Sequence, residues 1–167
     1  IEMIDLDRRS HRLASALATL QPRDHVLIDC PPSLGLLTVN ALVAADAVLV
    51  PLQCEFFALE GLSQLIGTIE RVRSSLNPQL ALLGIVLTMV DKRNRLTENV
   101  SDDVRAVMGD KVFTTTIPRN VRLSEAPSHG MPALLYDNRC AGSEAYVALA
   151  RELLQRTALA KPVETVS

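Results

Sequence analysis

Residues 26–35 place one carboxylate between an apolar run and a proline pair. Asp29 follows three apolar residues that predict a buried strand. The residues that stop this strand and lead into the next apolar helix are Pro31, Pro32, Ser33 and Gly35. A carboxylate at the carboxyl end of a buried strand suits a metal ion that carries phosphate. An aspartate that caps the next helix is the commoner alternative, so the chemistry needs support from elsewhere in the chain.

Length and composition fit a single α/β domain. A chain of 167 residues buries roughly two-thirds of its unfolded surface. Hydrophobic residues make up 48% of it and aromatic residues 3%, which suits a core of Leu, Val and Ala and argues against disorder. The net charge of −2 gives no general attraction to nucleic acid, so DNA binding would need a local basic patch.

The cysteines and the chain start carry further expectations. Cys30, Cys54 and Cys140 form no CxxC pair, which argues against a disulfide framework or a zinc site and favours a reducing cytoplasm. Cys30 is expected to be a small buried residue beside the strand end. No uncharged apolar run is long enough to span a bilayer. The start at Ile1, without methionine, suggests a piece of a longer protein.

Apolar periodicity predicts strands that alternate with helices. The expected strands cover residues 25–29, 47–51, 80–90 and 111–117. The expected helices cover residues 8–20, 35–45, 59–75, 100–108, 121–126 and 146–154. Such alternation predicts a parallel sheet covered on both faces, with ligands at the carboxyl ends of its strands.

Polar side chains gather where these strands end. They are Asp29, Gln53, Glu55, Asp91, Arg119 and Asn120. Because loops are polar in general, this gathering alone is a weak signal of a site.

Several separate stretches resemble the ParA/Soj family of chromosome- and plasmid-partitioning ATPases, which carry a deviant Walker A motif. They are residues 28–38, 51–55, 58–62, 87–89 and 117–130. The last stretch, Ile-Pro-Arg-Asn-Val-Arg-Leu-Ser-Glu-Ala-Pro-Ser-His-Gly, is the most specific. The resemblance extends to about Leu154. It implies a three-layer, doubly wound parallel sheet of the P-loop NTPase type, incomplete and with about four strands present.

The chain departs from the family at the phosphate-binding loop. A P-loop reads G-x-x-x-x-G-K-[ST], and none of the seven glycines precedes a lysine. The resemblance therefore implies that residues 1–156 are roughly the carboxyl-terminal two-thirds of a ParA-type ATPase domain, followed by a frayed tail at residues 157–167. This chain alone is then expected to hydrolyse no ATP, because the loop that cradles the phosphates is absent.

By resemblance, Asp29 is the Walker B aspartate, which holds Mg²⁺ through water. Residues 31–35, with Pro31, Pro32, Ser33 and Gly35, match switch II, which senses the γ-phosphate at the dimer interface.

The resemblance also implies an adenine pocket and a DNA-binding surface. The pocket residues are Met89, Pro118, Arg119 and Asn120, although Met89 as core filler and Pro118 as a strand stop remain alternatives. The DNA-binding residues are Lys92, Arg93, Arg95 and Arg122, which would contact phosphates without reading bases. Solvated surface charge is the alternative for these cations. Asp91 is expected to have a structural role, either capping the next loop or ordering the basic residues that follow it.

For the intact protein the resemblance implies a cytoplasmic, nucleoid-associated ATPase that segregates chromosomes or plasmids. It would bind ATP and Mg²⁺, form a homodimer, coat DNA non-specifically and respond to a ParB-type partner. A membrane-associated ATPase like MinD is one alternative, but Pro162 disfavours the amphipathic tail helix that it needs. A non-catalytic remnant that binds only DNA or a partner is the other.

Overall fold

The computed structural model describes residues 9–21, 23–31, 33, 35–91 and 93–160. Contacts divide the chain into two compact units, one of residues 1–48 and 61–82, the other of residues 49–60 and 83–167. The chain passes between the units inside its strands and inside one helix, so no linker in the sequence marks the division.

Two strands, β1 (Ala47–Gln53) and β2 (Ala81–Thr88), pair in a parallel sheet. Helix α3 (Ala58–Ser75) joins them and supplies the crossover that a parallel pair requires. The α/β class and the P-loop NTPase-like architecture, incomplete here, are confirmed.

The fourth expected strand is present only as isolated pairing with β2. Parallel bridges join Ile85 to Val112 and Val90 to Pro118. Two further amides of this segment, those of Thr114 and Thr115, donate to the carboxylate of Glu152. Because a side chain takes these donors, the ladder alongside β2 is interrupted.

The first expected strand, residues 25–29, is wrong for this chain. These residues have no strand pairing, and Val26 and Leu27 are 54% and 85% exposed. A strand needs a hydrogen-bonded neighbour, and none of the residues that the structure describes provides one. Cys30 is exposed as well, so the expectation that it is buried is also wrong.

The first unit contains η1 (Arg9–His11), α1 (Arg12–Leu17), α2 (Leu36–Ala44) and most of α3. Its core consists of Leu42, Val43, Ile69, Val72 and Leu80.

The side chains of Asn40 and Asn77 join separate segments of the first unit by hydrogen bonds. The Asn40 amide donates to the carbonyls of Arg9 and Leu36 and accepts from the Leu13 amide. Asn77 lies within 3.0, 3.3 and 2.8 Å of the carbonyl oxygens of Leu42, Val43 and Ala45. It therefore satisfies carbonyls that the end of α2 leaves without a helical partner.

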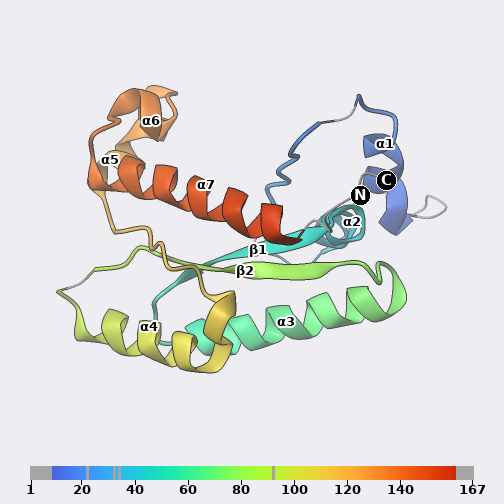
Figure 1. The fold of residues 1–167 in the computed structure, drawn as a ribbon, viewed down its shortest axis with the longest axis horizontal. Coiled ribbons are helices and arrows are strands. Elements are labelled where there is room, and N and C mark those ends of the chain that lie inside the picture. The colour runs from blue at the N-terminus through green and yellow to red at the C-terminus, as the bar shows by residue number, and fades with distance from the viewer. Residues whose placement is uncertain (1–8, 22, 32, 34, 92, 161–167) are drawn as a thin grey trace, which may run out of the picture. The chain divides into compact units, whose positions relative to one another are not determined.

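The second unit contains η2, η3 and four α-helices. The elements are α4 (Arg95–Met108), η2 (Gly109–Lys111), α5 (Val121–Glu125), η3 (Ala126–His129), α6 (Ala133–Tyr136) and α7 (Ala141–Ala160). Figure 1 shows α4 and α7 on opposite sides of the strands. The core of this unit consists of Val86, Phe113, Ile117 and Leu149.

Helices α5 and α7 approach each other closely at Gly142. A Cβ on Gly142 would lie 2.5 Å from the Leu123 side chain, so α7 and α5 can meet only without it. The sequence pattern does not predict the short helices η3 and α6, and α7 continues past Thr157 to Ala160. No helix in the described ranges is long and apolar enough to cross a membrane.

Candidate functional site

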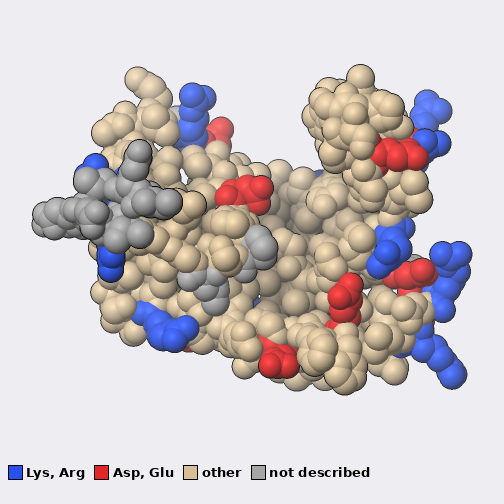
Figure 2. Space-filling view, turned by 180° about the vertical axis from the view of Figure 1, so that it is seen from behind, with Lys and Arg blue, Asp and Glu red and all other residues tan. Residues whose placement is uncertain are grey.

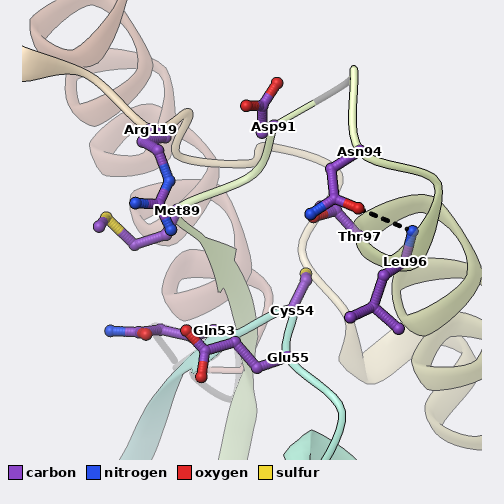
Figure 3. Close-up of a pocket in the computed structure, with 9 residues that line it drawn as sticks. All are labelled: Gln53, Cys54, Glu55, Met89, Asp91, Asn94, Leu96, Thr97 and Arg119. Carbon is purple, nitrogen blue, oxygen red and sulfur yellow. Dashed lines mark hydrogen bonds between the residues drawn. The ribbon is translucent and has the colours of Figure 1, made fainter.

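A pocket of about 340 Å³ lies in the second unit, just beyond the carboxyl ends of β1 and β2 (Figure 3). It is lined by Gln53, Cys54, Glu55, Met89, Asp91, Asn94, Leu96, Thr97 and Arg119. These residues come from the end of β1, the end of β2, the start of α4 and the turn after residue 117. The pocket thus occupies the sheet edge at which open α/β folds bind ligands.

The backbone after β2 brings the pocket residues together. Met89 has φ 55°, a left-handed conformation that is uncommon and costly for a residue other than glycine. The next residue, Val90, donates its amide to the Ile117 carbonyl at 3.1 Å and accepts from the Arg119 amide at 3.0 Å. These bonds hold the 117–119 backbone beside Val90, and Met89 and Arg119 line the same pocket.

The four expected adenine-binding residues divide into two pairs. Met89 and Arg119 line the pocket, where Figure 3 shows their side chains on the same side. Pro118 and Asn120 flank it in the chain without lining it. The Asn120 Oδ1 accepts the amide of Arg122 at 2.9 Å and so caps α5. The nucleotide-binding roles of all four residues stay predictions.

Arg93 is held by the carboxylate of Asp91. Its Nε lies 3.2 Å from Asp91 Oδ1, and its Nη2 lies 3.4 Å from Oδ2. The Arg93 backbone amide also donates to Oδ1, at 3.0 Å. Asp91 therefore orders this basic residue, as expected, and the hydrogen bonds from Arg93 lower the pKa of Asp91 below its usual value. Lys92 lies outside the described residues.

Arg122 lies in a wider network. Its Nη1 is 2.9 Å from Glu125 Oε2, and its Nε is 3.6 Å from Asp137 Oδ2. The Tyr136 hydroxyl donates to the same Glu125 oxygen at 3.2 Å. The hydrogen bond and charge of Glu125 raise the pKa of Arg122. Arg93 and Arg122, two of the three arginines expected to bind DNA, are thus paired with carboxylates of their own unit.

The surface around these arginines carries both signs of charge. Figure 2 shows Lys and Arg interspersed with Asp and Glu at the right edge, the side of the second unit that carries α4, α5 and α6. Arg95 is exposed at the start of α4, next to Asn94, whose side chain caps that helix. The cations therefore do not form a patch of one sign.

Known proteins similar to the chain assign its family. It is 64% identical over 159 residues to the chromosome partitioning protein ParA of Caulobacter vibrioides, in an alignment that covers 93% of the chain and 60% of that protein. It is 53% identical over 154 residues to the sporulation initiation inhibitor protein Soj of Bacillus subtilis, covering 92% and 61%. The chain belongs to the ParA/Soj family. An AAA domain family model matches residues 1–82.

A solved structure shares the fold of the chain. Cobyrinic acid a,c-diamide synthase from Mycobacterium smegmatis, crystallised with ADP and magnesium, matches with a TM-score of 0.77 and 35% identity. The match covers 99% of the chain and 61% of that protein. The chain spans about 60% of the length of the relatives that it matches.

The residues that resemble Walker B and switch II lie in the first unit. Asp29, Pro31 and Ser33 are exposed, and Pro32 lies outside the described residues. Gly35 is the N-cap of α2, and the Thr38 hydroxyl donates to the Ser33 carbonyl, which fixes the turn before that helix. The roles of Asp29, Pro31, Pro32, Ser33 and Gly35 stay predictions.

The chemistry of Asp29 fits a magnesium ion that keeps most of its waters. Mg²⁺ is usually held by one or two carboxylates together with phosphate oxygens. The described residues contain no group of three or more His, Cys, Asp or Glu that could enclose a metal. A single exposed carboxylate therefore suits Mg²⁺ brought by a nucleotide better than a resident metal.

Sequence reasoning missed the residues that brace the turn before Pro118. Glu152 accepts the amides of Thr114 and Thr115, both at 2.8 Å. Arg156 donates to the carbonyls of Asp110 and Val112, at 2.9 and 3.0 Å. The only sequence pattern that marks these two residues is a Glu–Arg pair at i,i+4 on the final helix. Such a pair more often lies on a solvent-exposed helix face.

Proposed function

We propose that the full protein to which this chain belongs is a partitioning ATPase. It binds ATP with Mg²⁺, forms a homodimer, coats DNA without sequence preference and is stimulated by a ParB-type partner in the cytoplasm, at the nucleoid. The 64% identity to a chromosome partitioning protein over 93% of the chain carries this proposal. A structural relative crystallised with ADP and magnesium supports the nucleotide and the ion.

In this proposal Asp29 serves the metal ion and the residues of the pocket serve the base. Asp29 orients the Mg²⁺ waters, and the ion supplies the charge that stabilises phosphoryl transfer. Met89 offers an apolar surface to the purine, while Arg119 and backbone groups of residues 117–120 offer polar contacts. The phosphate cradle belongs to the part of the family that residues 1–167 do not match, so this chain alone is inactive.

The nucleotide proposal is tested in the full native protein by ATP hydrolysis with DNA and partner present. Asp29→Asn should lower the rate at least about tenfold, because the carboxylate that positions the ion is lost. Asp46→Asn, the same change at another exposed aspartate of the first unit, should leave the rate unchanged. Equal rates for Asp29→Asn and the wild type would remove the Walker B assignment.

The DNA proposal is tested by binding to a random-sequence duplex across a salt series. Arg93→Glu and Arg122→Glu should each weaken binding and lower the salt slope by about 1. Arg73→Glu, at an exposed arginine of the first unit paired with Glu70, is the matched control. Unchanged affinity and slope in Arg93→Glu would remove that residue from the DNA surface.

A further inference from the structure

The guanidinium of Arg93 is engaged in the way that a phosphate would engage it. Two of its nitrogens face the two oxygens of the Asp91 carboxylate, and the same carboxylate accepts the Arg93 backbone amide. A carboxylate and a phosphate both present paired oxygens to the guanidinium fork. Two of the five guanidinium N–H groups, which a phosphate could use, are therefore engaged within the chain.

The pair is exposed enough to exchange partners. The Arg93 side chain is 91% exposed, whereas that of Asp91 is 28% exposed. Ion pairs between exposed groups contribute little net stability, so a DNA phosphate can compete for Arg93. Arg93 can turn toward a partner while Asp91 remains in place.

Asp91 has a second positive neighbour. It lines the pocket together with Arg119, whose charge also lowers the pKa of Asp91, after the larger effect of Arg93. In Figure 3 the Asp91 carboxylate points away from Cys54 and Glu55. When Arg93 leaves, the carboxylate is still partly compensated by Arg119, which makes the exchange less costly.

We propose that Asp91 is an intramolecular competitor for Arg93, and that DNA binds by displacing the Asp91 carboxylate from the Arg93 guanidinium. This inference rests on the proposed DNA-binding function. It assigns Asp91 a part in setting DNA affinity: its carboxylate keeps the affinity low, so that bound protein dissociates readily.

The test uses the full native protein with ATP and Mg²⁺, and a fluorescent 30-base-pair duplex of random sequence read by anisotropy. Asp91→Asn keeps an oxygen that can accept the Arg93 backbone amide, so the loop retains its turn while the carboxylate is lost. Arg93→Gln and the variant with both substitutions complete a double-mutant cycle. Asp103→Asn is the matched control, because Asp103 is exposed on α4 in the same unit and has no ion pair within the described ranges.

We expect Asp91→Asn to tighten binding about two- to fivefold, the range expected for release of one exposed ion pair. Asp103→Asn should change it by less than about 1.5-fold. In the Arg93→Gln background, Asp91→Asn should have no more effect than the control, since the cation it would release is gone.

Three outcomes would overturn the inference. If Asp91→Asn leaves binding unchanged or weakens it while Arg93→Gln also weakens it, Arg93 contacts DNA but Asp91 does not compete. If Asp91→Asn tightens binding equally in both backgrounds, the effect comes from removing one negative charge that repels DNA, and not from releasing Arg93. If Arg93→Gln has no effect, the proposed DNA role of Arg93 itself fails.

Discussion

Different kinds of side chain stabilise the backbone in the two units. In the first unit, neutral amide side chains of Asn40 and Asn77 satisfy backbone groups at helix ends. In the second unit, an ion pair takes this role: Glu152 accepts two backbone amides, and Arg156 donates to two carbonyls and lies 4.0 Å over the Phe113 ring. A neutral amide does not titrate, whereas a carboxylate does. Acid should therefore weaken the hydrogen bonds that Glu152 accepts in the second unit. The hydrogen bonds of Asn40 and Asn77 in the first unit should not change with pH.

The difference bears on the candidate site. The segment held by Glu152 and Arg156 leads directly into the 117–120 backbone, which lies beside Val90 at the pocket. The segment that leads into the pocket of the second unit is thus held by Glu152, which lies 37 residues beyond Thr115 in the chain.

The largest effect is expected for Asn77→Ala. The change removes the donor for carbonyls of Leu42, Val43 and Ala45, and should lower the free energy of unfolding by about 1–3 kcal/mol. Urea denaturation of the purified protein measures it. Gln79→Ala, at an exposed neighbour, should stay within about 0.5 kcal/mol. Equal stabilities for the two variants would contradict the conclusion that the Asn77 hydrogen bonds stabilise the first unit.

Glu152→Gln should have a smaller effect, about 1 kcal/mol, because one amide of Thr114 or Thr115 loses its acceptor while the other can keep one. The same denaturation experiment measures it, with exchange of the Thr114 and Thr115 amides as a local probe. Glu144→Gln, on the exposed first turn of α7, is the matched control. Unaltered exchange of both threonine amides would show that the Glu152 carboxylate does not hold this segment.

Arg156→Lys keeps the charge but loses the planar fork that reaches two carbonyls, together with the guanidinium above Phe113. We expect a loss of about 0.5–1 kcal/mol in unfolding free energy. Arg151→Lys, exposed on the same helix, should have no measurable effect. A variant as stable as the wild type would mean that charge alone, rather than the fork, matters at this position.

The smallest effect is the response to acid. Burial raises the pKa of Glu152, but hydrogen bonds from Thr115, Thr114 and Arg156 together hold that pKa below its ordinary value. A carboxyl whose pKa is lower in the folded state contributes stability above its unfolded pKa, about 4.3, and loses it as the pH falls through the folded value.

An acid titration followed by NMR should show the amide shifts of Thr114 and Thr115 moving together below the ordinary glutamate pKa. In Glu152→Gln this movement should vanish, whereas Asn77→Ala should retain it. A titration that persists in Glu152→Gln would assign the acid response to another carboxyl.

Much of the fold follows from local patterns. The turn at Asn77 and Pro78 ends α3, and Gly109, at φ 54°, closes α4, as the sequence predicts. The apolar runs at residues 47–51 and 80–90 do form strands, because each finds the other as its hydrogen-bonded neighbour. Residues 25–29 have the same apolar character and form none, because strand formation requires a partner and not only a pattern.

By itself the sequence determined the family, through motifs such as residues 117–130 that need no coordinates to be read, and it placed Gln53, Glu55 and Asp91 at or just beyond the ends of β1 and β2. Only the tertiary structure decided what each of these residues touches. Asp137 reaches Arg122, and Glu152 reaches Thr114 across 38 positions. The physical reason is that periodicity and propensity act over a few neighbouring residues, whereas hydrogen bonds and ion pairs depend on distances that only the folded chain sets.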